Sequence, residues 1–298
     1  AAKEKIRVHD SVFLEDLPSD ERNELLKFCY YMDRQVYCNT KLSDIMIRGS
    51  GLTQYHDSPV FFCNHFGMEI SKRAVKRCFD LVFSVLFLLT FSPLLLVIAV
   101  CIKCEDGGSV IYRQVRCTRD MKKFEIYKFR SMITDAEKNR GPQLATKHDK
   151  RLTRVGRFLR NTKLDELPQL FNVLSGDMSL VGPRPERPEI IAEYQKEMPE
   201  FVFRTRVKAG VTGFAQIYGK YNTVPYDKLK LDLFYIENYS LWMDLKLILM
   251  TVKTVLKKDS TEGVDTDQTT GLKEHTEGNE EVERKIQEYT SREESHHE

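Results

Sequence analysis

An acidic pair, Asp165-Glu166, is the feature of the sequence best suited to chemistry. A carboxylate with an ordinary pKa of about 4 is ionised at neutral pH, so it can attack an electrophile without a base. Proline is tolerated only in the first turn of a helix, so Pro168 places the start of a helix near Asp165. An aspartate there is also a favoured N-cap, which leaves a purely architectural role open. The stretch 164–174 has helical periodicity, and its apolar face consists of Leu167, Leu170 or Phe171, and Leu174.

Basic residues surround the acidic pair in the sequence. Two prolines flank Arg184 in the segment 182–185, and they would hold its guanidinium in a fixed direction. Arginine matches phosphate oxygens well, although a rigid structural turn explains the same segment equally. The helix predicted just before the pair has a basic face, which favours an anion-binding surface and consists of Arg151, Arg154, Arg157 and Arg160.

The elements that must position these side chains can be read from periodicity and turn residues. The helix at 241–257 has one apolar side that either lies on a membrane surface or closes the core, and we favour the core. Strands are predicted at 12–14, 35–38, 58–63, 110–112, 124–129 and 211–216. Helices are predicted at 19–33, 225–238 and 241–257.

Residues 81–102 form an apolar run without a charge, long enough to enter a bilayer. Ser92-Pro93 lies at its middle, where proline removes a backbone donor. Both flanks are basic, beginning with Lys76 and Arg77 before the run, and basic residues favour the cytoplasmic side. A helix–break–helix hairpin that enters and leaves one leaflet satisfies both flanks. A kinked transmembrane span remains the alternative.

Charge is segregated along the chain. Residues 259–298 carry 13 acidic and 4 basic residues, whereas residues 1–258 carry 42 basic and 31 acidic ones. We expect the acidic tail to be flexible, with a short helix at 280–289. The basic body suits phosphorylated ligands, nucleic acid or an anionic membrane face, but no nucleic-acid recognition module is recognisable. The cysteines form neither a disulfide framework nor a zinc site, which indicates reduced thiols in a cytoplasmic compartment.

Several stretches, taken in order, make residues 72–258 resemble the bacterial sugar transferases, also called monotopic phosphoglycosyl transferases. They include Lys76-Arg77-Cys78-Phe79-Asp80, Ser92-Pro93, Tyr127-Lys128-Phe129-Arg130-Ser131-Met132, Leu164 to Leu174, Gly176 to Pro185, and Gly210-Val211-Thr212-Gly213. The sequence departs from the family pattern at Lys163, which replaces the commoner serine before the acidic pair.

The resemblance implies a mixed α/β fold, with a mostly helical catalytic domain at 104–258 and a re-entrant membrane helix hairpin at 72–103. Residues 1–71 resemble the end of an α/β nucleotide-binding-like regulatory domain, inside which this chain would start. The acidic flexible tail at 259–298 completes the expected organisation. The hairpin residues are Lys76, Arg77, Ser92 and Pro93.

The resemblance also implies the chemistry. A UDP-sugar would give its sugar 1-phosphate to undecaprenyl phosphate, the initiating step of exopolysaccharide, capsule or O-antigen synthesis. Asp165 would be the nucleophile and a ligand of Mg²⁺, with Glu166 positioning the metal, positioning a basic neighbour or assisting the acceptor. Lys128, Arg160 and Arg184 match the family's phosphate-binding and active-site basic residues.

The expected location is the bacterial inner membrane, with the catalytic domain on the cytoplasmic face and membrane lipid as a partner. A homodimer is compatible with this organisation, and no nucleic-acid partner is expected. A membrane-anchored scaffold would not need the acidic pair, and one apolar hairpin provides too little membrane structure for a transporter. The sequence therefore favours an enzyme.

Overall fold

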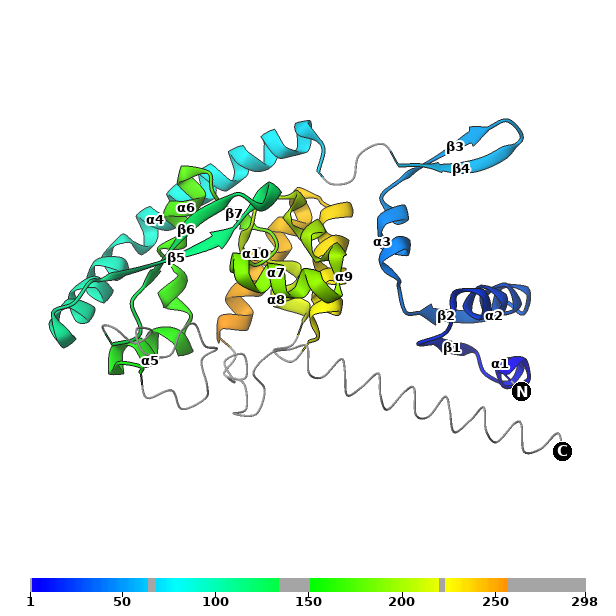
Figure 1. The fold of residues 1–298 in the computed structure, drawn as a ribbon, viewed down its shortest axis with the longest axis horizontal. Helices are drawn as coiled ribbons and strands as arrows, with labels where there is room; N and C mark the ends of the chain where they lie inside the picture. The colour runs from blue at the N-terminus through cyan, green and yellow to red at the C-terminus, as the bar shows by residue number, and fades with distance from the viewer. Residues whose placement is uncertain (1, 64–67, 134–150, 220–222, 257–298) are drawn as a thin grey trace. The chain divides into compact units, whose positions relative to one another are not determined.

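The computed structural model describes residues 2–63, 68–133, 151–219 and 223–256, and Figure 1 labels their elements. The architecture is mixed α/β and mostly helical, as expected. The chain divides into two compact units, Ala1–Arg48 and Gly49–Glu298. The predicted acidic tail, with its short helix at 280–289, lies outside the described residues.

The first unit is a small α/β arrangement. Strands β1 (Ser11–Leu14) and β2 (Gln35–Cys38) pair in parallel across helix α2 (Ser19–Tyr31), because parallel neighbours need a crossover connection. These two strands and this helix confirm the sequence prediction. Two further helices, α1 (Ala2–Val8) and α3 (Leu42–Arg48), have no counterpart in it. The core of the unit consists of Ile6, Leu14, Leu25 and Cys29.

The second unit begins with an antiparallel hairpin of strands β3 (Gly51–Tyr55) and β4 (Ser58–Phe62). Strand β4 confirms the strand predicted at 58–63. Helix α4 (Ile70–Asp106) follows and has 37 residues, a length of about 55 Å at the rise of an α-helix. It is long and apolar enough to cross a membrane, and only 11% of its most apolar 18-residue stretch is buried. That exposure is unlike the core helix of a soluble protein.

Helix α4 runs through Pro93 without interruption, so the break predicted at this position is not present. Proline cannot donate to the carbonyl four residues earlier, which is that of Leu89. The hydroxyl of Ser92 donates to this carbonyl instead, at 2.8 Å. The freed acceptor is therefore satisfied within the helix, which explains why the helix continues.

Both ends of α4 pack on the rest of the second unit. Near the start, the Arg77 guanidinium donates to the carbonyls of Val173 and Leu174 at 2.6 and 2.9 Å, where helix α6 (Gln169–Ser175) ends. Near the end of α4, Asp106 pairs with Arg130. Between these anchors, many apolar side chains are exposed, among them Val82, Val85, Leu86, Leu89, Leu96, Val97 and Val100.

Strands β5 (Ile111–Cys117) and β6 (Lys123–Phe129) form an antiparallel ladder beside α4 (Figure 1). They confirm the strands predicted at 110–112 and 124–129. Helix α5 (Arg154–Asn161) approaches the end of β6 closely, since a Cβ added to Gly156 would lie 2.0 Å from the Ser131 carbonyl oxygen. Only glycine fits there, and the close approach leaves Arg160, in the last turn of α5, within hydrogen-bond distance of Ser131.

The rest of the unit closes around a short parallel pair, β7 (Ser179–Val181) and β8 (Gly210–Thr212). The helices predicted at 225–238 and 241–257 are confirmed, whereas the strand predicted at 211–216 ends at Thr212 because helix α8 begins at Phe214. The surrounding elements are α7 (Pro188–Glu197), the 3₁₀ segment η3 (Pro199–Arg206), α8 (Phe214–Tyr218), α9 (Pro225–Glu237) and α10 (Leu241–Leu256).

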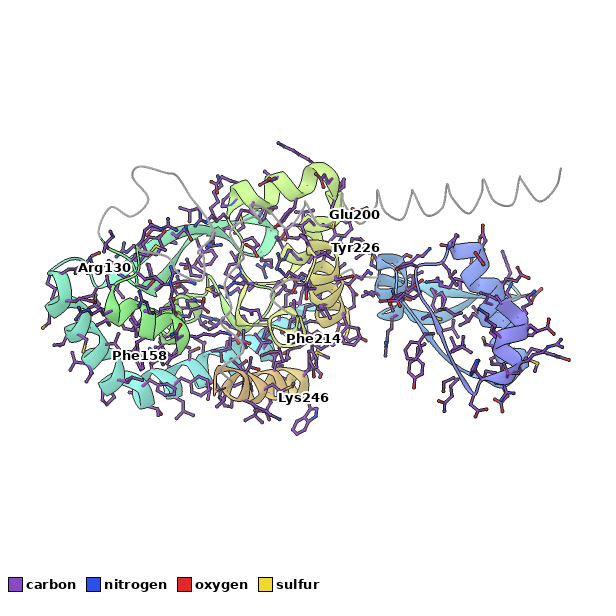
Figure 2. The ribbon with its side chains drawn as sticks, turned by 90° about the horizontal axis from the view of Figure 1, so that it is seen from below. Arg130, Phe158, Glu200, Phe214, Tyr226 and Lys246 are labelled. Atoms are coloured by element: carbon purple, nitrogen blue, oxygen red, sulfur yellow. The ribbon has the colours of Figure 1, made fainter. Side chains whose placement is uncertain are left out.

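Helix α10 closes the core, as the sequence favours. Asp244 and Leu247 are fully buried on one face, whereas Trp242 and Leu249 are exposed on the other. Figure 2 shows Lys246 on this outer side. The apolar residues of α10 therefore serve both a buried and an exposed face.

A buried charge cluster joins α4 to α9 and α10. The Lys76 ammonium lies 2.6 Å from a carboxylate oxygen of Asp244, and the Tyr235 hydroxyl donates to the other oxygen at 2.7 Å. The Asp80 carboxylate accepts from the backbone N–H of Leu180 at 3.1 Å. Lys76 is only 7% exposed, so this expected membrane-flanking lysine lies inside the protein.

We predict that Lys76→Met lowers the free energy of unfolding by about 3 kcal/mol, because it leaves the buried Asp244 carboxylate without its cation. Thermal or urea unfolding of the detergent-purified protein measures the change. The control is Lys72→Met, whose exposed partner Glu69 lies 4.0 Å away, and its effect should be below about 0.5 kcal/mol. Equal stability of the two variants would contradict this role.

Candidate active site

The acidic pair lies in η2 (Leu164–Glu166), a 3₁₀ turn between α5 and α6. Lys163 precedes it with φ of 56°, the left-handed conformation that few residues other than glycine adopt. The backbone N–H of Glu166 donates to the Lys163 carbonyl at 3.2 Å. The reversal at Lys163 thus separates α5 from the turn that presents the two carboxylates.

Asp165 does not cap the following helix, which corrects one reading of the sequence. Helix α6 starts only at Gln169, with Pro168 at its N-cap position. Because Pro168 has no N–H, the preceding residues form three-residue turns such as Leu167 N–H to the Leu164 carbonyl at 3.3 Å. An architectural N-cap role for Asp165 is therefore excluded.

Glu166 holds two of the predicted basic residues. One of its carboxylate oxygens lies 2.6 Å from the Lys128 ammonium and 3.0 Å from the Arg184 guanidinium. Burial alone would raise the pKa of Glu166, but Arg184 and Lys128 outweigh it and lower that pKa well below its ordinary value. The same carboxylate raises the pKa of Arg184. Glu166 is therefore a fixed anion between two fixed cations.

Asp165 is buried yet has no hydrogen-bond or ion-pair partner for its carboxylate among the described residues. Burial, followed by the charge of Glu166, raises the pKa of Asp165 to about 6, although Lys128, Arg160 and Arg184 oppose the rise. This pKa lies above the ordinary value assumed from the sequence. The carboxylate is still mostly ionised at pH 7, and it is free to meet a ligand.

Arg160 completes the basic surround. Its Nε donates to the Ser131 hydroxyl at 2.9 Å, which holds the side chain against the end of β6. Its charge also acts on the pKa of Asp165. The structure thus brings together Asp165, Glu166, Lys128, Arg160 and Arg184, the predicted catalytic and phosphate-binding residues.

The four predicted hairpin residues lie elsewhere. Lys76 joins α4 to α10, and Arg77 joins it to α6. Ser92 and Pro93 lie in the middle of α4, and no hydrogen bond or ion pair within the described part of the chain joins them to the acidic pair. These four residues are therefore separate from the candidate active site.

Some residues that shape the site escaped the sequence analysis. Asn172 is buried in α6, where its side chain accepts from the Tyr127 N–H at 2.9 Å and donates to the Glu125 carbonyl at 2.7 Å. These two bonds fix β6, and hence Lys128, beside the segment that carries Asp165. A polar residue among the apolar residues of a short predicted helix was the available signal, because buried polar groups need partners.

The family model described as "Bacterial sugar transferase" matches residues 71–258. The chain belongs to this family. The matched range contains every residue of α4 from Ser71 on and every residue of the candidate active site. The resemblance read from the sequence is thereby confirmed.

Curated relatives of this bacterial sugar transferase include three bacterial proteins. The chain is 42% identical over 185 residues to the UDP-N-acetylgalactosamine-undecaprenyl-phosphate N-acetylgalactosaminephosphotransferase of Aeromonas hydrophila (61% of this chain, 44% of the relative). It is 41% identical over 229 residues to the undecaprenyl-phosphate glucose phosphotransferase of Komagataeibacter xylinus (71% and 43%). It is 38% identical over 252 residues to the UDP-glucose:undecaprenyl-phosphate glucose-1-phosphate transferase of Klebsiella pneumoniae (83% and 52%). The chain therefore spans about half the length of these relatives.

Proposed function

We propose that this chain transfers a sugar 1-phosphate from a UDP-sugar to undecaprenyl phosphate, the initiating membrane step of exopolysaccharide, capsule or O-antigen synthesis. The observation that carries the proposal is the Asp165 carboxylate, which has no partner among the described residues and is buried beside three cations while Glu166 occupies two of them. The names of the relatives, which specify transfer of sugar phosphates to undecaprenyl phosphate, support it.

The proposed reaction has two displacements at one phosphorus. A carboxylate oxygen of Asp165 attacks the phosphorus that bears the sugar. The bond from that phosphorus to the UMP oxygen breaks, and its electrons leave with UMP. A phosphate oxygen of undecaprenyl phosphate then attacks the same phosphorus, and Asp165 departs as a carboxylate. The product is a polyprenyl diphosphate sugar, and the enzyme is regenerated.

The basic residues reduce the repulsion between Asp165 and an anionic donor. Lys128 and Arg184 both pair with Glu166, so within the described part of the chain the pair Asp165-Glu166 presents one free carboxylate and one that is neutralised. Fixed cations of this kind stabilise charge that spreads over phosphoryl oxygens in the transition state. These contacts favour the reading in which Glu166 positions basic neighbours.

Mg²⁺ is the metal that we propose for the site. No group of three or more His, Cys, Asp or Glu side chains within the described ranges could hold a metal, so a cage made only of protein is not expected. Proteins commonly bind Mg²⁺ through one or two carboxylates together with substrate phosphates. The free Asp165 carboxylate fits this mode. Bound with the donor diphosphate, Mg²⁺ would neutralise charge and polarise the phosphoryl group.

We predict that Asp165→Asn lowers turnover about 10⁴-fold or more, because an amide cannot displace UMP. UMP release by the detergent-purified protein, with undecaprenyl phosphate, Mg²⁺ and a panel of UDP-sugars, measures the effect. Asp120→Asn is a matched control, since Asp120 is the middle residue of the 3₁₀ segment Arg119–Met121 and its side chain is 79% exposed. Near-normal turnover by Asp165→Asn would exclude Asp165 as the nucleophile.

We further propose that α4 is re-entrant, with both of its ends on the cytoplasmic face of the inner membrane. A transmembrane span puts its ends on opposite sides of an apolar core about 30 Å thick. Here both ends pack on one unit, through Arg77 at the start and Asp106 near the end. The free apolar surface lies between them, around Pro93. This arrangement supports entry and exit through one leaflet, with the helix bending at Pro93 when it is in lipid.

The domain organisation is proposed on the same basis. Residues 104–258 would form the catalytic domain, with the re-entrant segment at 72–103 before it. Residues 1–71 would be the end of an α/β nucleotide-binding-like regulatory domain, and the parallel β1–α2–β2 arrangement is consistent with such a domain.

Re-entrant topology predicts that cysteines at positions 74 and 109 are labelled from the same side of the membrane. The test uses A74C and S109C separately, in a version whose seven native cysteines are replaced by serine. An impermeant thiol reagent should label both in inverted vesicles and neither in spheroplasts. As a control, L89C in the exposed middle of α4 should resist the reagent in both preparations. Labelling of positions 74 and 109 from opposite sides would establish a transmembrane span instead.

A further inference from the structure

Hydrogen bonds to its backbone carbonyls hold the loop Pro183–Glu186, which carries Arg184. Each of its four carbonyl oxygens accepts a hydrogen bond from a different partner. Because every carbonyl of the loop accepts a hydrogen bond from a group outside it, the conformation of the loop is strongly determined. The donors are Gly210 N–H to Pro183 (2.9 Å), Arg204 Nη2 to Arg184 (3.2 Å), Arg116 Nη1 to Pro185 (3.2 Å) and Cys117 N–H to Glu186 (3.0 Å).

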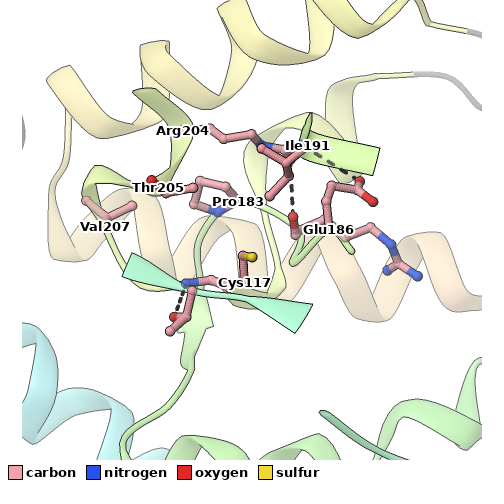
Figure 3. A pocket seen from close by; sticks show the side chains of 10 residues that line it. Cys117, Pro183, Glu186, Ile191, Arg204, Thr205 and Val207 are labelled. Atoms are coloured by element: carbon pink, nitrogen blue, oxygen red, sulfur yellow. Dashed lines mark hydrogen bonds and ion pairs between the residues drawn. The ribbon is translucent and has the colours of Figure 1, made fainter. Parts of the chain in front are cut away.

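Arg204 is the residue that binds the carbonyl of Arg184, the predicted phosphate-binding residue of the loop. Its side chain extends from η3, and Figure 3 shows it reaching toward Glu186 near Pro183. Besides the Arg184 carbonyl, its guanidinium lies 2.7 Å from Asp232 of α9 and 3.7 Å from Glu186. Its face lies 4.8 Å from the centre of the Phe201 ring. Four contacts on different sides leave the guanidinium one orientation.

Burying this charged pair is costly. Arg204 is 6% exposed and Asp232 is 1% exposed. Burial raises the pKa of Asp232 to about 6, and Glu186 adds to the rise, although Arg204 and Lys228 oppose it. Buried ion pairs seldom stabilise a fold more than apolar residues of similar volume. We therefore attribute the pair to the orientation that it imposes on the loop and not to stability.

We propose that Arg204, held in place by Asp232, is a positioning residue for phosphoryl transfer, because it fixes the loop that directs the Arg184 guanidinium toward Glu166 and the donor phosphates. This inference rests on the proposed function. Arg184 bonds Glu166 at 3.0 Å, so a shift of its backbone would move the cation relative to the acidic pair. Displacements of about 1 Å can cost about 100-fold in rate when groups must align for reaction.

The test is a double-mutant cycle between positions 204 and 184. Arg204→Lys keeps the positive charge beside Asp232 but cannot bond Asp232, Glu186 and the Arg184 carbonyl together. We expect it to lower kcat/KM for the UDP-sugar about 100-fold, mainly through kcat, with little change in the unfolding midpoint. In an Arg184→Met background, the same substitution should lower kcat/KM less than about twofold, because the residue it positions is gone. Arg206→Lys, two residues later in η3, is the matched control and should retain wild-type kcat/KM.

A loss of similar size in both backgrounds would assign Arg204 a general structural role and overturn the proposal, as would wild-type kcat/KM in Arg204→Lys. If Arg204→Lys does not fold, Asp232→Asn replaces it, since the amide keeps the shape and an acceptor for Arg204. If the wild type releases no UMP with any UDP-sugar, the proposed function fails. In that case the same four proteins are compared by their affinity for UMP, measured by calorimetry. Losses of UMP affinity that add up in the double variant would overturn the positioning role, as would the absence of UMP binding.

Discussion

Glu166 shares one carboxylate oxygen between the Lys128 ammonium and the Arg184 guanidinium, and the other features of the site depend on this contact. Lys128 comes from β6 and Arg184 from the loop after β7, so the contact joins segments that are distant in sequence. Because Glu166 uses its charge on these cations, its neighbour Asp165 keeps a carboxylate that no other described residue binds, within the same positive field. A nucleophile facing a diphosphate needs that combination.

A second constraint concerns the long apolar helix. The energy of burying Lys76 and Asp244 together is recovered only if α4 stays in contact with α10. Arg77 adds two bonds to the carbonyls that end α6, the helix that follows the acidic pair. The segment expected to enter the membrane is thus joined rigidly to the segment expected to do chemistry. A lipid phosphate held at the membrane surface could then meet Asp165 without a large movement of the protein.

The sequence predicted those elements and site residues that a local pattern of residue types marks. Periodicity located α9 and α10, and residue type with spacing located the acidic pair and its basic residues. The role of Asp165 as an N-cap was wrong, because Pro168 delays the α-helix and Lys163 reverses the chain before it. The helix is continuous through Pro93 in the structure, where the Ser92 hydroxyl satisfies the Leu89 carbonyl, and the re-entrant bend stays a prediction. Pairs such as Lys76 with Asp244 or Arg204 with Asp232 could not be predicted, since no local pattern connects residues so far apart.

The central claim is that Asp165 becomes covalently bound to the sugar phosphate, and mass spectrometry after rapid quenching tests it most directly. Wild-type protein mixed with UDP-sugar and Mg²⁺, without undecaprenyl phosphate, should gain the mass of one sugar phosphate on the tryptic peptide that begins at Leu164. The adduct should disappear when undecaprenyl phosphate is added, and Asp165→Asn should not form it. Turnover that proceeds only with both substrates bound, and with no adduct at any quench time, would contradict the claim and indicate direct transfer.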